Sequence, residues 1–425
     1  MASIDSEEKK LKKKLEELEK EYNENLFEEP EKSLSEPPEV SSYEEPEISS
    51  YEEPVIPKKL PAEIFKKPKF VKKPLEIEKD IIKQGNNKRF QMKASLENNG
   101  LSGKINPAEI KNIAEKINIL RKEISKILVG QEEIVDGLIR GLLCNSHVLV
   151  EGVPGIAKTL AIRALAAASG CSVKRIQFTV DMLPTDIIGV TTYTPEKGFE
   201  IIKGPIFANF LIADEINRAP PKTQSALIEG MQEKQVTIGR ESFSLPNPFF
   251  VMATENPIEN AGVYPLPEAQ IDRFLFKLIM GYPESEEEKK IMDTNMTIKR
   301  FEEFDLKPVI NPKEILKMQD LVKKVYLDDT IKNYILTIVR KTRSKDFENA
   351  QYISYGCSPR ASIGLFIASK ANALMDGRDY VLPEDVRKIA FEVLRHRLIL
   401  SYKASIQKIS PDLIVKEILD SVGIE

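Results

Sequence analysis

The chain has 425 residues, of which 30% are charged and 41% hydrophobic, an ordinary composition for a folded protein of two or three structural units. Its formal net charge of -4 excludes the overall basic field that drives non-specific nucleic-acid binding, so nucleic acid is not the expected partner. Three scattered cysteines and two histidines predict neither a disulfide framework nor a transition-metal site, and a reducing cytoplasm is the expected compartment. No run approaches about 18 consecutive apolar residues, so no membrane span is expected.

Residues 1–105 are predicted to form a disordered tail rich in charge and proline. Apolar residues at spacings of three and four between residues 11 and 26 fit either a short coiled coil or a solvated helix. Two near-identical octapeptides follow at 41–48 and 49–56, inside an acidic block that gives way to a basic one. Charge blocks with little apolar content are typical of a tether.

The folded part is predicted to begin near residue 106 with a helix. Between about residues 141 and 282, short apolar runs such as HVLVEG and NFLIAD alternate with helix-like stretches, which is the pattern of an α/β domain with a parallel sheet. Beyond Pro283 the strand pattern stops, and amphipathic helical patterns continue to the end of the sequence. The expected domains are therefore an α/β core at 106–282 and an all-helical unit at 283–425.

A glycine-rich loop, GVPGIAKT, lies between an apolar strand and an alanine-rich helix. This order predicts a phosphate-binding loop, in which backbone N–H groups face the phosphates, a lysine reaches them and a threonine hydroxyl binds Mg²⁺. Ala157 replaces the last glycine of the usual pattern, and alanine is tolerated there if its φ is negative. The candidate nucleotide ligands of the loop are Gly152, Val153, Pro154, Gly155, Ile156, Ala157, Lys158 and Thr159.

Two further strands end in polar side chains. NFLIAD ends in Asp214 and Glu215, and ionised carboxylates belong at the carboxyl end of such a strand, where ligands bind in parallel sheets. Asp214 is the candidate Mg²⁺ ligand beside Thr159, and Glu215 is the candidate base for the attacking water. The strand at 249–253 leads to Asn256, whose amide can hold that water or sense the terminal phosphate, although a loop-capping asparagine would look the same.

Several longer segments of the sequence resemble segments of one known protein family. GVPGIAKT, FLIADEINRAPPKTQSALIEGMQEKQV, ATENPIENAGVYPLPEAQIDRF, GCSPRAS and LPEDVRKIAFEVLRHRLILSY together resemble the MoxR branch of the AAA+ ATPases, over roughly residues 107–420. The resemblance implies a P-loop αβα core with a parallel sheet, followed by an all-helical lid. It implies ATP and Mg²⁺ as cofactors and a homo-oligomeric ring, usually a hexamer, with ATP at the subunit interfaces. It also implies that Gly130 and Gln131 border the adenine.

The same resemblance implies roles for two arginines. Arg273, in EAQIDRF, falls at the arginine finger, and Arg360, in SPRAS, falls at sensor 2. A guanidinium from a neighbouring subunit can neutralise transition-state charge, which would make hydrolysis depend on assembly. A structural ion pair between Arg273 and Asp272 is the competing interpretation. Whether Arg360 acts in its own subunit or in the next stays open.

The function implied by the resemblance is a chaperone-like ATPase that remodels or matures protein complexes, often with a von Willebrand factor A domain partner. Two hairpin-like segments, at 193–201 and 235–246, resemble family elements that face the pore or partners, and plain surface hairpins are the alternative. The alternative functions are a DNA-acting motor, a magnesium-chelatase-like subunit and a nucleotide-gated scaffold with little turnover.

Overall fold

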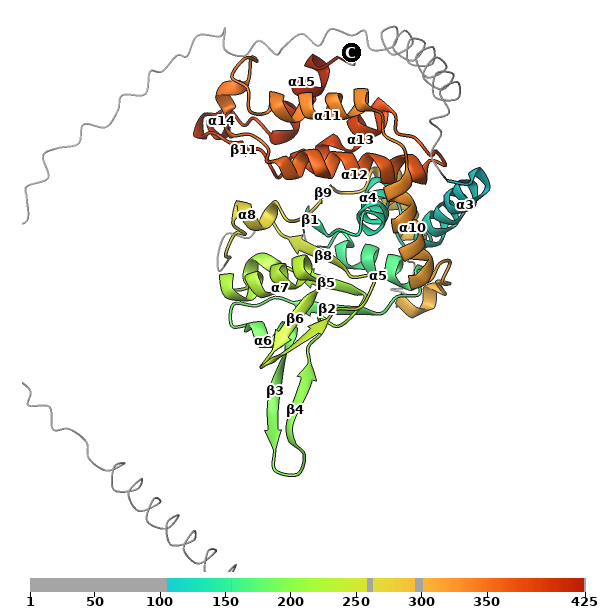
Figure 1. Ribbon diagram of the computed structural model, residues 1–425, viewed down its shortest axis with the longest axis vertical. Coiled ribbons are helices and arrows are strands. Elements are labelled where there is room, and N and C mark those ends of the chain that lie inside the picture. Colours follow the sequence, from blue (N-terminus) through green and yellow to red (C-terminus); the bar gives the residue numbers. More distant parts are fainter. Residues whose placement is uncertain (1–104, 154, 258–262, 295–300, 424–425) are drawn as a thin grey trace, which may run out of the picture. The chain divides into compact units, whose positions relative to one another are not determined.

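The computed structural model describes residues 105–153, 155–257, 263–294 and 301–423, which belong to one compact unit (Figure 1). The predicted tail, apart from Ile105, lies outside the described residues, and so does Pro154. Among the described helices, none combines the length and the apolar character needed to cross a bilayer.

A five-stranded parallel sheet lies at the centre of the unit, with the strand order β2-β5-β8-β1-β9. Alternate residues of one strand face opposite sides of a sheet. Accordingly Phe210 and Ile212 join one hydrophobic cluster, whereas Leu211 and Ala213 join a second cluster on the other face. Both faces of the sheet are therefore buried, which explains why NFLIAD reads as a continuous apolar run.

The elements have the following bounds. The strands of the central sheet are β1 (Val148–Gly152), β2 (Val173–Gln177), β5 (Phe210–Asp214), β8 (Phe250–Glu255) and β9 (Phe276–Met280). The helices are α3 (Pro107–Ile124), α4 (Glu132–Leu143), α5 (Lys158–Ala168), α6 (Pro184–Ile188), α7 (Pro221–Glu233), α8 (Glu268–Ile271), α9 (Ser285–Thr294), α10 (Pro312–Lys324), α11 (Asp329–Lys341), α12 (Pro359–Met375), α13 (Pro383–Leu394), α14 (Tyr402–Ile406) and α15 (Pro411–Ser421).

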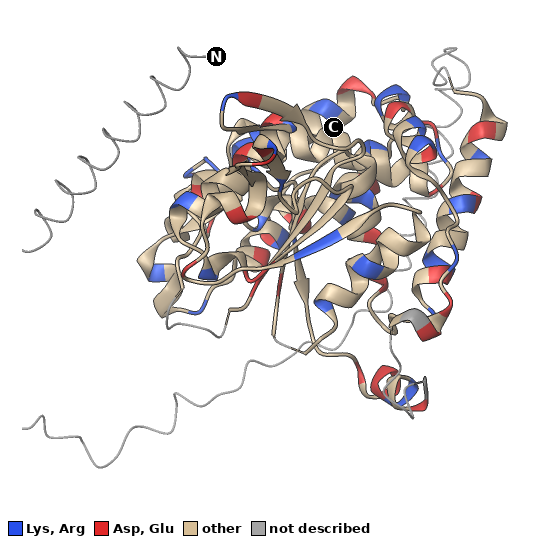
Figure 2. Cartoon of the chain, turned by 90° about the horizontal axis from the view of Figure 1, so that it is seen from below, with Lys and Arg blue, Asp and Glu red and all other residues tan. Residues whose placement is uncertain are grey.

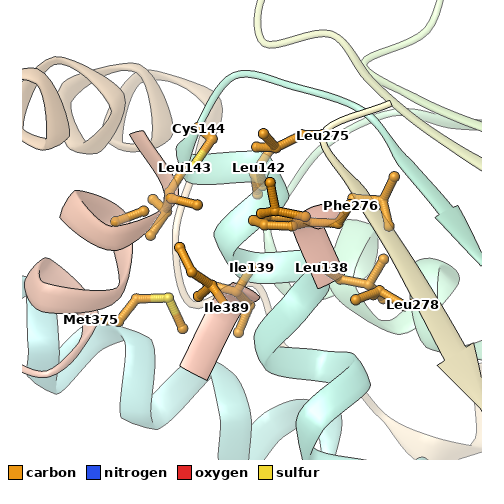
Figure 3. Packing of buried hydrophobic residues seen from close by; sticks show 14 of the residues in the cluster. Leu138, Ile139, Leu142, Leu143, Cys144, Leu275, Phe276, Leu278, Met375 and Ile389 are labelled. Atoms are coloured by element: carbon orange, nitrogen blue, oxygen red, sulfur yellow. The ribbon is translucent and has the colours of Figure 1, made fainter. Parts of the chain in front are cut away.

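The helical lid that follows the sheet shares its hydrophobic core. Figure 3 shows Leu138 and Leu142 of α4 beside Phe276 of β9, with Met375 of α12 and Ile389 of α13 close by. All five side chains belong to one cluster of buried residues. The lid is helical, as the sequence predicts, but it also contains a two-stranded antiparallel ribbon, β10 (Ile353–Tyr355) with β11 (Ile399–Leu400). These strands are too short for a period-2 pattern to reveal them.

Both hairpin-like segments form hairpins. The first pairs β3 (Gly189–Thr194) with β4 (Gly198–Lys203), and the second pairs β6 (Gln235–Ile238) with β7 (Glu241–Ser244). The β3–β4 hairpin projects away from the central sheet (Figure 1). Near its tip, Tyr193 and Phe199 are 64% and 80% exposed, with their ring centroids 5.2 Å apart. An exposed aromatic pair of this kind is available for contact with another molecule.

Positions of Lys and Arg are interspersed with positions of Asp and Glu along the helices, and the strands consist mostly of other residue types (Figure 2). Among the described helices drawn in this view, Lys and Arg positions do not extend along a helix without interruption, as a segment that tracks a nucleic-acid backbone would require.

Candidate active site

The strand order brings the predicted site residues to one edge of the sheet. Asp214 ends β5, the glycine-rich loop follows β1, and Asn256 follows β8, which lies between those two strands. A cavity of about 430 Å³ opens there. It is lined by Gly155, Ala157, Lys158, Thr159, Leu160, Arg163, Asp214, Glu215 and Asn256. Catalytic and phosphate-binding candidates from three strands therefore share one cavity.

Lys158 is the first residue of α5, and its ammonium group is held inside the loop. Its Nζ atom donates hydrogen bonds to the carbonyl oxygens of Gly152, at 2.6 Å, and Glu255, at 3.2 Å. Gly152 has no room for a side chain, because a Cβ atom would lie 2.6 Å from the Ile156 side chain and 2.8 Å from the Met280 carbonyl oxygen. The loop is therefore closely packed against the ends of β8 and β9.

Ala157 corrects one expectation. Its φ is +68° and its ψ is +25°, which is the left-handed conformation, so the condition of a negative φ, under which alanine was expected to be tolerated, is not met. The physical reason is the sharp turn from loop to helix, which requires here the conformation that the usual glycine adopts without strain. A side chain in this conformation costs roughly 1–2 kcal/mol, and such strain is often found at functional sites.

We expect Ala157→Gly to raise the free energy of unfolding by up to about 1.6 kcal/mol. The relief of roughly 1–2 kcal/mol of backbone strain outweighs the roughly 0.4–1 kcal/mol that glycine loses through the greater freedom of the unfolded chain. Urea unfolding of the two chains measures the difference. The matched control is Ala161→Gly, a fully buried position inside α5, which should lower stability by at least about 1 kcal/mol. Equal destabilisation by both changes would contradict this account of Ala157.

Asp214 is held by three neighbours. Its Oδ2 atom accepts hydrogen bonds from the Thr159 hydroxyl at 3.1 Å and from Nη2 of Arg175 at 2.7 Å. Its Oδ1 atom accepts one from the Thr254 hydroxyl at 2.6 Å. Burial by itself raises the pKa of Asp214, but the hydrogen bonds from Thr254 and Arg175 outweigh it and hold the pKa below its usual range. Asp214 is therefore an ionised carboxylate at neutral pH, which is what its predicted role as a cation ligand requires.

Glu215 has an unusual backbone, with φ of +57° in the left-handed region. Its N–H group donates to the Thr254 hydroxyl at 2.9 Å, so Thr254 joins the two consecutive acidic residues. Oε2 of Glu215 accepts a hydrogen bond from Gln177 at 2.7 Å and pairs with Arg218 at 3.2 Å. These three contacts fix the orientation of Glu215 at the end of β5.

Sequence reasoning missed Thr254 and Arg175. Thr254 stands two residues before Asn256 in the motif, and its place at the end of a buried strand was the available signal. Arg175 had no such signal, because its contact with Asp214 depends on β2 lying beside β5. Only the order of the strands reveals that pair.

Gly130 and Gln131 contact the segment that follows β9. The Nε2 atom of Gln131 donates a hydrogen bond to the carbonyl oxygen of Gly281 at 3.3 Å. Met280, the residue before Gly281, packs against Gly152. Gly130 has a φ of +74°, and a Cβ atom there would lie 2.2 Å from the side chain of Glu287. The segment expected to border the adenine is thus linked to the first glycine of the loop only through residues 280 and 281, and it does not line the cavity.

Arg273 and Arg360 do not line the cavity. Asp272 pairs with Arg397, Nε to Oδ1 at 2.8 Å, and more distantly with Arg360, Nη1 to Oδ2 at 3.7 Å. It also accepts a hydrogen bond from the Ser358 hydroxyl at 2.9 Å. Arg273 is exposed, and within the described part of the chain its side chain makes no ion pair or hydrogen bond. The ion pair between Arg273 and Asp272 is therefore not formed.

Known proteins similar to this chain indicate one family of ATPases. Residues 147–276 match the model of the ATPase family associated with various cellular activities (AAA), and residues 346–418 match an AAA lid domain. Chaperone MoxR1 of Mycobacterium tuberculosis is 43% identical over 326 residues, which cover 75% of this chain and 85% of that protein. The chain belongs to the MoxR family of AAA+ ATPases.

Two further comparisons support the membership of this chain in the MoxR family. The uncharacterised protein YeaC of Bacillus subtilis is 45% identical over 304 residues, 71% of this chain and 93% of that protein. A crystal structure of a proposed ATPase from Cytophaga hutchinsonii is 40% identical, with a TM-score of 0.69, and covers 78% of this chain and 99% of that chain. The similarity thus extends over both the α/β core and the lid.

Proposed function

We propose that the chain binds and hydrolyses ATP in a homo-oligomeric ring, expected to be a hexamer, and uses the energy to remodel or mature protein complexes. The observation that carries the ATPase part is the meeting of Lys158, Thr159, Asp214, Glu215 and Asn256 in one cavity. This set supplies a phosphate contact, two oxygen ligands for a cation, a base and a polar amide, which are the parts that phosphoryl transfer needs.

The residues fit ATP with Mg²⁺. The Thr159 hydroxyl and the Asp214 carboxylate are 3.1 Å apart, and Mg²⁺ favours such oxygen ligands while keeping several waters of its own. When bound, Mg²⁺ neutralises charge on the phosphate oxygens. Lys158 would turn from the carbonyl oxygens that it now contacts toward the β- and γ-phosphates, and the loop N–H groups at the start of α5 would hold those phosphates. Gly130 and Gln131 would border the adenine.

Glu215 would accept a proton from the attacking water, and Asn256 would hold that water. Both line the same cavity, and Asn256 is 4% exposed. Thr254 contacts Asp214 and the Glu215 backbone together, so the cation ligand and the base would keep a constant separation. Phosphoryl transfer depends on this kind of positioning more than on covalent help.

Arg273 and Arg360 would complete the site of a neighbouring subunit. Arg273 is exposed and lies outside the cavity of its own chain. Arg360 is 47% exposed in its side chain and pairs with Asp272, the residue directly before Arg273. Arg360 is thus paired with the residue adjacent to Arg273, and this proximity favours action of both arginines at the same neighbouring ATP.

The remodelling role rests on the family and on the β3–β4 hairpin. One relative is named a chaperone, and the hairpin exposes Tyr193 and Phe199, which suit contact with a polypeptide client. A von Willebrand factor A domain protein as partner and the cytoplasm as compartment remain predictions from the sequence.

The experiment is a steady-state ATPase assay on the purified chain with two effectors, an unfolded model polypeptide and duplex DNA. We expect Mg²⁺-dependent hydrolysis that rises with protein concentration as rings assemble, at about 1 s⁻¹ per subunit or more, and stimulation by the polypeptide. Stimulation by DNA with a steep salt dependence would instead support the DNA-motor alternative. Absence of hydrolysis by assembled rings would leave only the nucleotide-gated scaffold.

A further inference from the structure

A buried arginine of the lid, Arg397, binds the backbone on both sides of Arg273. Arg397 lies between α13 and β11, and its side chain is 3% exposed. Its Nη2 atom donates to the carbonyl oxygens of Asp272, at 3.2 Å, and Phe274, at 2.6 Å. These are the residues immediately before and after Arg273. Two carbonyl groups that flank the exposed arginine are thus bound by one nitrogen atom.

The remaining N–H groups of Arg397 are also engaged. Nε donates to Oδ1 of Asp272 at 2.8 Å, and Nη1 donates to the carbonyl oxygens of Leu275, at 3.0 Å, and Val393. A guanidinium has five N–H donors in a planar, rigid arrangement, and here all five are used. Four of the five donate hydrogen bonds to residues 272–275, so these bonds fix the orientation of this segment relative to the guanidinium plane.

The neighbouring lid residue reinforces the contact. His396 bonds through Nε2 to the carbonyl oxygen of Phe274 at 3.1 Å, and Phe274 is fully buried. Asp272 in turn accepts the hydroxyl of Ser358, which caps α12. The segment that bears Arg273 is therefore bound to two parts of the lid, more than 80 residues further along the chain.

We propose that Arg397 is a positioning residue for the arginine finger: it fixes the backbone of residues 272–275 so that Arg273 reaches the ATP of the neighbouring subunit. The inference rests on the proposed role of Arg273 in the neighbour's site. It follows from the geometry that Arg397 does not touch the nucleotide and acts only through the segment that it binds. Loss of Arg397 should therefore harm the neighbour's site and spare the chain's own site.

The test uses Arg397→Lys, because lysine keeps the charge but cannot bind several carbonyl groups in one plane. We expect kcat to fall by about 10²-fold, the effect of a misplacement of about 1 Å, with ATP affinity unchanged. Arg395→Lys is the matched control. Arg395 also lies in the lid and binds the β9 backbone, but at the carbonyl oxygen of Lys277, beyond the finger segment. Its turnover should stay within about threefold of the wild type.

Mixed rings separate positioning from a general structural effect. Arg397→Lys chains keep Glu215, and Glu215→Gln chains keep an intact finger segment. Each chain alone should be nearly inactive, but an equal mixture should recover about a quarter of the wild-type rate, because half of the sites keep Glu215 and half of those face an intact Arg397. If the mixture stays inactive, or if assembled Arg397→Lys rings turn over at the wild-type rate, the inference is wrong.

Two further variants keep the result interpretable. If Arg397→Lys does not fold, Asp272→Asn removes the charged partner of Arg397 while the carbonyl contacts remain, and it should give a smaller loss, about tenfold, that the same mixture restores. Wild-type turnover of assembled Asp272→Asn rings would then refute the positioning role. Full activity of Arg273→Ala would instead refute the finger role on which the inference rests.

Discussion

Arg273→Ala is expected to lower kcat by about 10³-fold while ATP binding and ring assembly are retained, since an arginine finger contributes roughly 10³-fold or more to hydrolysis. The structural reason is the position of this side chain. It is exposed, it lies outside its own cavity, and the adjacent Asp272 is already paired with Arg397 and Arg360. The guanidinium would thus be available to a neighbouring subunit of the proposed ring.

Steady-state turnover, ATP titration and sedimentation of the same preparation would measure these three quantities. Arg340→Ala is the matched control, because Arg340 is an exposed arginine in the last turn of α11 with no contact to the segment at 272–275 among the described residues. Its turnover should equal that of the wild type. An Arg273→Ala ring that keeps full activity would exclude the finger role.

Glu215→Gln is expected to lower kcat by about 10²–10⁴-fold, because glutamine cannot accept the proton of the attacking water. The amide is nearly isosteric, so the hydrogen bond with Gln177 and the backbone contact with Thr254 can persist, and ATP should still bind. We therefore expect rings that stay in the ATP-bound state. Loss of ATP binding together with turnover would show that Glu215 has a structural role instead.

The decisive measurement is a single-turnover assay with radiolabelled ATP, which separates binding from the chemical step. The control is Glu233→Gln, which makes the same chemical change at an exposed position at the end of α7. That variant should hydrolyse ATP at the wild-type rate. Equal rates for wild type and Glu215→Gln would contradict the role of Glu215 as the base.

Local patterns were sufficient for the elements and for most residues of the cavity. Buried parallel strands are continuous apolar runs, and helices repeat every three to four residues, so β1, β5, β8 and α5 could be predicted within a few residues. Ionised side chains avoid the interior of such strands, which placed Asp214 and Glu215 at a carboxyl end. The roles of these residues in ATP hydrolysis remain proposals.

The tertiary structure alone decided which distant groups meet. The order β2-β5-β8-β1-β9 places Asn256 between the loop and Asp214, and it brings Arg175 to the same carboxylate. Arg397 reaches Asp272 across 125 positions of sequence. Such contacts follow from the packing of whole elements, which no short window of sequence contains. The left-handed Ala157 belongs here too, because the geometry of the folded turn overrides the local preference of alanine.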